Sequence, residues 1–163
     1  MYTDFVYRRH VERRTIQDLV TEAKESIEEL SVHDLKNEIA SGTCTPVDIR
    51  DFRERLLDGT IPGAVSAPRG MLEWWFDPDS PYHRDEFAMD GRYVFFCSLG
   101  WRSALATVAI RDLGFENVAH LEDGFSGWVE SQQTVEEVNS GGKWFSSRND
   151  IVASFEMETE LEK

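Results

Sequence analysis

One stretch of the chain, residues 93–113, constrains the fold more than any other. Four apolar residues, Tyr93 to Phe96, predict a buried strand that ends at Cys97. A tight turn with Gly100 in its middle follows, and the Ala- and Leu-rich run Ser103 to Leu113 predicts a helix. This order of elements is typical of an α/β protein. It places Cys97 at the carboxyl end of a strand, where open α/β sheets bind their ligands.

The turn after Cys97 favours a reactive cysteine. The backbone N–H groups of Ser98 to Ser103 have no strand partner, and the N-terminus of the following helix carries a partial positive charge. Arg102 adds a full positive charge. All three features favour a thiolate at Cys97, and they could hold an anionic sulfur adduct or a tetrahedral oxyanion. The alternative is a buried structural cysteine, the commoner fate of a single cysteine.

The turn also resembles a known family. Residues 97–103 read Cys-Ser-Leu-Gly-Trp-Arg-Ser, which resembles the active-site loop of the rhodanese (sulfurtransferase) domain, Cys-x-x-Gly-x-Arg-Ser/Thr. Residues 47–50 with 59–64 are similar to the family's first signature. Residues 121–128 are similar to its closing signature, although Asp123 replaces the first of two adjacent glycines. Together the resemblance covers roughly residues 31–138.

The resemblance implies a rhodanese-like fold, an open and mainly parallel five-stranded sheet with helices on both faces. We expect an N-terminal helical extension over 1–30, the rhodanese-like domain over 31–138 and an acidic C-terminal extension over 139–163. Helical spacing of apolar residues predicts an amphipathic helix over 13–30, packed on its own domain or on a second subunit. Further helices are expected over 31–40, 51–57, 71–76, 82–89 and 124–130, and further strands over 46–50, 61–67 and 117–121.

The family's activity implies that Cys97 carries sulfur. Its thiolate would take the outer sulfur of thiosulfate or of a persulfide, and a thiophilic acceptor, either a small molecule or a protein, would then remove it. No metal and no organic cofactor are implied. The resemblance implies that Asp48 supports the loop, together with Arg50; alternatively, Asp48 only caps the helix that begins at Asp51. The loop that would hold the persulfide consists of Ser98, Leu99, Gly100, Trp101, Arg102 and Ser103.

Two other functions stay open. Many rhodanese-like domains are regulatory interaction modules, which typically lack the cysteine. Cysteine phosphatases and arsenate reductases also close a cysteine loop with an arginine, but with five residues between the two, whereas Ser98 to Trp101 are four. In addition, Leu99 and Trp101 make this loop more apolar than that of the thiosulfate enzymes. A protein persulfide or a persulfide of a small thiol such as glutathione is therefore an alternative donor or acceptor.

Several other side chains have two interpretations each. Cys44 is either a resolving thiol for Cys97 or a small apolar filler. Trp74 and Trp75 either wall the mouth of the site or pack in the core. His83 is the histidine that we expect nearest the site, as a general base or as an exposed turn residue. We expect structural or exposed positions for the other histidines, which are His10, His33 and His120.

The net charge and the distribution of apolar residues limit the possible partners and cellular location of the protein. A net charge of −14 argues against binding to nucleic acid or to an anionic membrane surface, and it disfavours long-range attraction of a small dianion such as thiosulfate. No apolar run approaches the length of a membrane span, and the first residues lack the apolar core of a signal peptide. We therefore expect a cytoplasmic protein with both cysteines reduced. The sequence does not indicate an oligomeric state.

Overall fold

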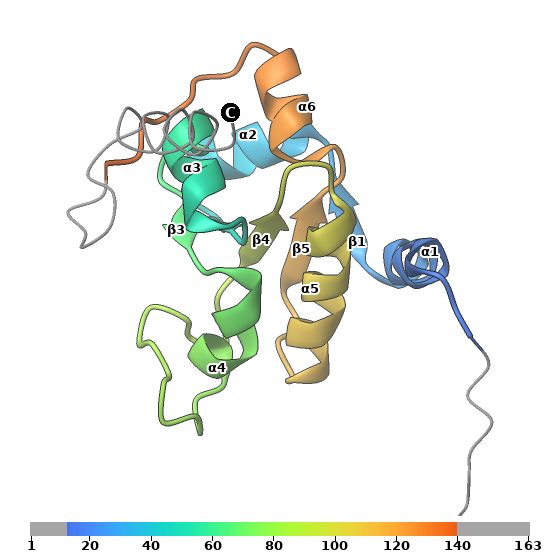
Figure 1. Ribbon diagram of the computed structural model, residues 1–163. Coiled ribbons are helices and arrows are strands. Elements are labelled where there is room, and N and C mark those ends of the chain that lie inside the picture. Colours follow the sequence, from blue (N-terminus) through green and yellow to red (C-terminus); the bar gives the residue numbers. More distant parts are fainter. Residues whose placement is uncertain (1–12, 140–163) are drawn as a thin grey trace, which may run out of the picture.

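The computed structural model describes residues 13–139, which form one sheet with helices around it (Figure 1). Five strands run in the order β1-β5-β4-β2-β3, and every neighbouring pair is parallel. The predicted α/β fold with a five-stranded sheet is confirmed, and its parallel character is complete. The strands are β1 (Glu28–Leu30), β2 (Thr45–Asp48), β3 (Val65–Ser66), β4 (Tyr93–Phe96) and β5 (Val118–Leu121).

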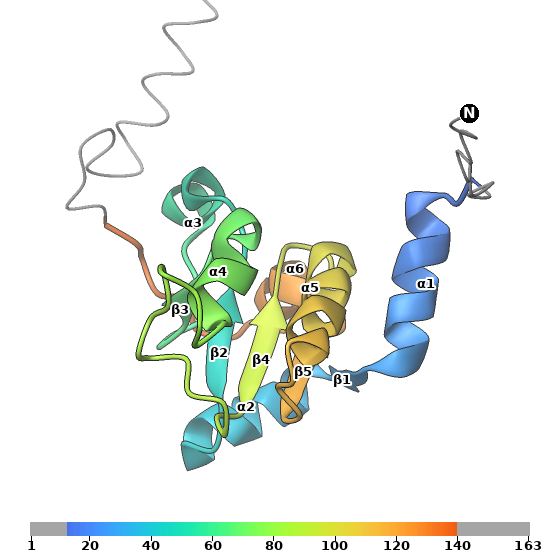
Figure 2. The same cartoon turned by 90° about the horizontal axis from the view of Figure 1, so that it is seen from below.

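Helices cover both faces of the sheet (Figures 1 and 2). Thr15, Ser31 and Asp51 each form a capping box that fixes the start of a helix. The helices are α1 (Ile16–Ser26), α2 (Val32–Ser41), α3 (Phe52–Asp58), the 3-10 helix η1 (Arg69–Met71), α4 (Leu72–Phe76), α5 (Trp101–Asp112) and α6 (Gly124–Glu130).

Strand β4 lies in the middle of the sheet and belongs to two apolar clusters. Phe95 packs with residues of α4 and α5 on one face, whereas Val94 and Phe96 pack with residues of α2 and α6 on the other. All four β4 residues are buried. Burial on both faces explains why the strand is a continuous apolar run rather than an alternating one.

The helix predicted over 13–30 is wrong in its last part. Helix α1 ends at Ser26, and Glu28–Leu30 form the edge strand β1, which pairs with β5. Leu30 packs into the core on the α2 and α6 face. Helix α1 itself packs against α5 beside the β1 edge. The spacing of Ile27 and Leu30 continues the helical period of α1, so the apolar pattern alone could not show where the helix stops.

The helix predicted over 82–89 is also wrong. This segment consists of successive turns, in which the N–H of Arg84 donates to the carbonyl of Trp75 and the N–H of Phe87 to that of Arg84. Phe87 is buried and stacks on Phe76 with 4.0 Å between ring centroids. The buried ring of Phe87 alone anchors the segment, so the segment does not need apolar residues at helical spacing.

Beyond α6 the chain runs to the segment between α3 and β3. The backbone of Glu136 pairs with that of Thr60 in an isolated antiparallel bridge, and its carboxylate accepts from the N–H of Gly63 at 2.9 Å. The expected acidic extension over 139–163 lies, except for Asn139, outside the described residues. Within the described part, no helix combines the length and the apolar character needed to cross a membrane.

Candidate functional site

Cys97 directly follows β4, and the loop 98–100 leads from it into α5. The sulfur is almost fully buried, with 1% of the residue exposed. Gly100 adopts a φ of 80°, which allows the sharp turn into the helix. Among the described residues, the N–H groups of 98–103 have no carbonyl partner, and the first paired amide is that of Ala104, which donates to the carbonyl of Gly100 at 3.2 Å. The predicted juxtaposition of unpaired amides and a cysteine is therefore present.

The first turn of α6 holds this loop by its backbone. The N–H of Phe125 donates to the carbonyl of Cys97 at 2.7 Å, and that of Ser126 donates to the carbonyl of Ser98 at 3.0 Å. Gly100 and Gly124 allow the two backbones to meet. A Cβ on Gly100 would lie 2.0 Å from the carbonyl oxygen of Glu122, and one on Gly124 would lie 2.7 Å from that of Cys97. Gly124, the glycine that follows Asp123, is therefore needed for this close approach of the two backbones.

Arg102 forms a two-pronged ion pair with Glu54 of α3. The guanidinium donates to the two carboxylate oxygens at 2.7 and 2.8 Å, and the hydroxyl of Ser98 donates to the same carboxylate at 2.9 Å. Hydrogen bonds from Arg102 and Ser98 hold the pKa of Glu54 at about 2, so its carboxylate is ionised throughout the physiological range. Glu54 was not among the predicted site residues. Its only signal was a glutamate three residues after Asp51, which also makes it the capping-box partner of α3.

Two apolar side chains project from the loop into solvent. Leu99 is 60% exposed and Trp101 is 49% exposed, although large apolar residues usually avoid water. They flank Gly100, so the surface next to the buried sulfur is apolar. The positive charge of Arg102, which also belongs to this loop, is neutralised by Glu54.

Asp48 and Arg50 form a buried ion pair at the end of β2. Arg50 donates from Nε and Nη2 to the two carboxylate oxygens at 3.0 and 2.8 Å, and the Thr60 hydroxyl donates to Asp48 at 2.7 Å. Arg50 also lies over the ring of Phe125, 4.0 Å from its centroid. Phe125 is the residue whose N–H holds the carbonyl of Cys97, so the ion pair reaches the loop indirectly. The interpretation of Asp48 as a cap of α3 is not borne out, because Asp51 makes that cap.

A second residue that the sequence analysis missed lies on the other side of Cys97. His120 of β5 is completely buried and shares a hydrogen bond of 3.1 Å with the hydroxyl of Ser103, which itself lies 3.6 Å from the Cys97 sulfur. We expected a structural or exposed histidine. The available signal was a histidine inside an otherwise apolar strand, where a polar side chain requires a partner.

Cys44 and Cys97 lie apart. Cys44 precedes β2, whereas Cys97 follows the parallel strand β4, and Cys44 packs with the cluster on the opposite face of the sheet. In this register Cys44 lies level with Arg92, five residues before Cys97, so about 16 Å separates the two cysteines along the sheet, which is too far for a disulfide. Burial raises the pKa of Cys44 to about 12. These observations favour the apolar filler over the resolving thiol.

Trp75 takes the core position that was one of its two interpretations, and His83 lies in a turn, as one of its two interpretations predicted. Trp75 packs against the core and is stacked by Arg84 at 3.4 Å, whereas Trp74 is exposed and packs edge-on against Tyr82. His83 hydrogen-bonds from its ring to the carbonyl of Trp75 at 3.1 Å. These contacts account for Trp75 and His83 as structural residues.

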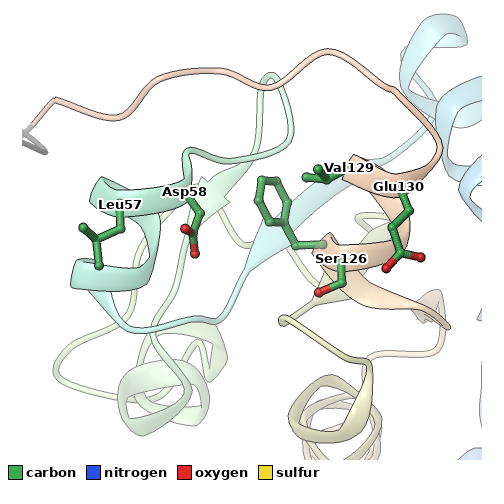
Figure 3. A pocket seen from close by; sticks show the side chains of 6 residues that line it. Leu57, Asp58, Ser126, Val129 and Glu130 are labelled. Carbon is green, nitrogen blue, oxygen red and sulfur yellow. The ribbon is translucent and has the colours of Figure 1, made fainter.

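A cavity of about 540 Å³ borders the residues that anchor the loop (Figure 3). Leu57 and Asp58 of α3 supply one wall, and the other wall comes from α6, with Ser126, Val129 and Glu130. The two carboxylates make this cavity unsuited to an anion. Among residues 13–139, no group of three or more His, Cys, Asp or Glu side chains could hold a metal ion.

Comparison with known proteins agrees with the geometry. A family model described as a rhodanese-like domain matches residues 31–131. The human thiosulfate:glutathione sulfurtransferase is 29% identical over 109 residues, which cover 63% of this chain and 94% of that protein. The structure of the human single-domain sulfurtransferase superposes with a TM-score of 0.56 at 28% identity, over 63% of this chain and 95% of that chain.

A bacterial structure is more similar still. A Rhodopseudomonas palustris protein, described as being of unknown function and as a possible tyrosine phosphatase, is 44% identical and superposes with a TM-score of 0.73. The match covers 77% of this chain and 96% of that chain. The matches to the family therefore cover most of the described residues. The R. palustris protein also makes phosphatase activity a candidate to consider.

Proposed function

This chain belongs to the rhodanese-like domain family, and we propose that it is a sulfurtransferase that carries sulfur on Cys97. One observation carries the proposal: Cys97 lies at the carboxyl end of β4, directly before the N-terminus of α5 and six backbone N–H groups that have no carbonyl partner within residues 13–139. Amides and a helix N-terminus stabilise negative charge on a bound atom. Names of relatives that denote sulfurtransferases support the same class.

In the first half-reaction the Cys97 thiolate attacks the outer sulfur of the donor. A bond forms between the Cys97 sulfur and that outer sulfur, while the bond from the outer sulfur to the rest of the donor breaks. The departing fragment keeps the electron pair, as sulfite from thiosulfate or as a thiolate from a persulfide. The product on the protein is an anionic Cys97 persulfide, and the loop amides stabilise its terminal sulfur.

In the second half-reaction a thiolate acceptor attacks the terminal sulfur of the persulfide. The sulfur–sulfur bond to Cys97 breaks, its electron pair returns to Cys97, and the acceptor leaves as a new persulfide. Glutathione is one acceptor to test, because a relative is named for it. The cycle needs no other oxidant or reductant, because the donor supplies an already oxidised sulfur. We propose the cytoplasm as its location, since a reducing compartment keeps Cys97 available as a thiolate.

The loop favours a donor that is not a small dianion. Leu99 and Trp101 present an apolar rim, and Glu54 neutralises the one arginine of the loop. The net charge of −14 also repels thiosulfate. We therefore propose a persulfide, on a small thiol or on a protein, as a better donor than thiosulfate.

Asp48 and Arg50 support the loop in this proposal. Their buried ion pair fixes the guanidinium over Phe125, and Phe125 in turn holds the carbonyl of Cys97. Both side chains are fully buried, so their contribution is positional.

Phosphate ester hydrolysis is the second candidate, because the similar R. palustris protein is described as a possible tyrosine phosphatase. The loop argues against it. Only four residues separate Cys97 from Arg102, and both arms of the guanidinium donate to Glu54. A non-catalytic interaction module is the alternative if no chemistry is found.

The test is steady-state turnover with cyanide as the common acceptor, which leaves with the sulfur as thiocyanate, measured above the uncatalysed rate. Thiosulfate and glutathione persulfide serve as donors, and the wild type, Cys97→Ser and Cys44→Ser are compared. We expect turnover in the wild type and in Cys44→Ser, a larger kcat/KM for glutathione persulfide, and no turnover in folded Cys97→Ser. Turnover that survives in Cys97→Ser contradicts the proposal. Hydrolysis of p-nitrophenyl phosphate that depends on Cys97, with no sulfur transfer, would establish the second candidate.

A further inference from the structure

A line of polar side chains leads from Cys97 across the sheet to its edge. The Cys97 sulfur lies 3.6 Å from the Ser103 hydroxyl, which lies 3.1 Å from Nδ1 of His120. Nε2 of His120 lies 2.8 Å from a carboxylate oxygen of Glu29. The parallel register places Glu29 of β1 directly beside His120 of β5, and Ser103 of α5 contacts both Cys97 and His120. Four separate elements thus contribute to one continuous chain of contacts.

The chemistry of Glu29 fixes the direction of the hydrogen bonds. Burial alone would raise the pKa of Glu29, but hydrogen bonds from His120 and Lys24 outweigh it and lower that pKa, so the carboxylate is ionised and only accepts. Nε2 of His120 must therefore carry a proton. Burial lowers the pKa of His120 against the opposing effect of Glu29, which favours the neutral ring with Nδ1 as an acceptor.

This tautomer orders the remaining contacts. The Ser103 hydroxyl donates to Nδ1 of His120, so the lone pairs of its oxygen face the thiol of Cys97. Ser103 and His120 are fully buried and Cys97 is 1% exposed, so water does not compete for these contacts. The buried hydrogen bonds thus connect a thiol to a histidine, and an ionised carboxylate accepts from the other nitrogen of that histidine. In this arrangement a base can activate a nucleophile.

We propose that His120 accepts the thiol proton of Cys97 through Ser103, with Glu29 holding the resulting imidazolium. The proton on sulfur moves to the Ser103 oxygen while the Ser103 proton moves to Nδ1, and the electron pair of the broken S–H bond stays on sulfur. The Ser103 hydroxyl then donates to the thiolate. His120 acts through Ser103, so it is a positioning residue. The inference rests on Cys97 being the nucleophile of the proposed function.

The charged groups around His120 are few, so its titration can be assigned. Glu29 faces it from β1 and Lys24 of α1 lies 3.1 Å from Glu29, while α5 contributes the uncharged Ser103. Cys97 is the titratable group at the end of β4, and Phe95, the β4 residue in register with His120, is apolar. Glu29 and Lys24 each have 27% of the side chain exposed, so this outer end of the chain reaches solvent.

The test measures ionisation of Cys97 directly and does not require sulfur transfer. In a Cys44→Ser background, the rate of alkylation by iodoacetamide is followed between pH 5 and pH 10 by intact mass. His120→Asn keeps an acceptor for the Ser103 hydroxyl but cannot take a proton. In this variant we expect the pH midpoint of Cys97 alkylation to rise by about one unit relative to the parent protein. At pH values below the midpoints of both proteins, alkylation of the variant should be about tenfold slower.

One further variant, Glu29→Gln, keeps the test decisive if His120→Asn does not fold. Glu29→Gln preserves a hydrogen bond to the ring and removes the charge, so we expect a smaller upward shift. Glu28→Gln on the same strand and His33→Asn on the surface of α2 are the matched controls and should show no shift. Because His120 acts only through Ser103, Ser103→Ala with His120→Asn should shift the midpoint no further than Ser103→Ala alone.

Unchanged midpoints in folded His120→Asn and Glu29→Gln overturn the inference. A lower melting temperature without a shifted midpoint means that His120 only packs in the core, and it overturns the inference as well. A shifted midpoint in a protein that forms no persulfide contradicts the proposed function and leaves the proton pathway standing.

Discussion

Glu54 joins three parts of the site: it caps α3, pairs with Arg102 and accepts from Ser98. A single carboxylate therefore links the helix after β2 to the loop after β4. The ion pair is partly exposed, so it contributes little to the free energy of unfolding, and its main effect is to fix the position of the loop. Loss of that fixation should affect reactivity more than folding.

We predict that Glu54→Gln lowers sulfur transfer by about tenfold, because a loop misplaced by a fraction of an ångström loses much of its reactivity. The pKa of Glu54 in the fold, about 2, lies below its ordinary value of 4.5. Its ionised form therefore stabilises the fold above pH 4.5, and this contribution disappears as the pH falls towards 2. Urea unfolding should show that the wild type has a larger free energy of unfolding than Glu54→Gln. This difference should be constant near neutral pH and shrink below pH 4.5.

Glu73→Gln is the matched control, since Glu73 pairs with Arg69 and, within the described part of the chain, has no hydrogen bond or ion pair to residues 97–103. Its sulfur transfer should equal that of the wild type. If Glu54→Gln also transfers sulfur at the wild-type rate, the ion pair does not position the loop.

Gly100 tests the close approach of two backbones. Gly100→Ala places a methyl group 2.0 Å from the carbonyl oxygen of Glu122, at a φ of 80°. We predict a loss of about 3 kcal/mol in the free energy of unfolding, together with loss of transfer activity. Gly42→Ala also has a positive φ, of 66°, but an open surrounding, and should cost only about 1 kcal/mol. Equal costs for the two variants, measured by urea unfolding, would contradict the steric argument.

At the scale of elements, the strand–loop–helix unit around Cys97 could be predicted from local sequence, because one apolar run and one glycine turn define it. Strand β1 could not be predicted, because its three residues continue the helical period of α1 and their pairing with β5 is non-local. Glu54 and His120 were missed for a related reason. Their partners Arg102 and Ser103 are far away in sequence, and only the packing of separate elements brings them together.

Strand β1 should contribute to stability through Leu30, which is 7% exposed in the core between the sheet, α2 and α6. We predict that Leu30→Ala lowers the free energy of unfolding by about 2–4 kcal/mol, the usual cost of a cavity in a core. Ile16→Ala on α1, at a residue that is 59% exposed, should change it by less than about 0.5 kcal/mol. Urea unfolding of both variants measures this difference, and a Leu30→Ala cost as small as that of Ile16→Ala would mean that β1 is dispensable.

At the scale of the whole molecule, the net charge of −14 acts on every charged reagent that approaches the loop. Repulsion extends over the Debye length, which falls from about 30 Å at 10 mM salt to about 8 Å at 150 mM. We predict that added salt accelerates alkylation of Cys97 by anionic iodoacetate several-fold, whereas the rate with neutral iodoacetamide stays constant. Both rates are measured by intact mass in the Cys44→Ser background. Equal salt responses would show that the overall charge does not select among donors.

The central claim is that Cys97 carries sulfur, and intact-protein mass spectrometry tests it most directly. The wild type, Cys97→Ser and Cys44→Ser are exposed briefly to thiosulfate and, separately, to glutathione persulfide. The account predicts a gain of one sulfur, about 32 Da, in the wild type and in Cys44→Ser but not in Cys97→Ser. A mass gain that persists in Cys97→Ser, or no gain in the wild type with either donor, would contradict it.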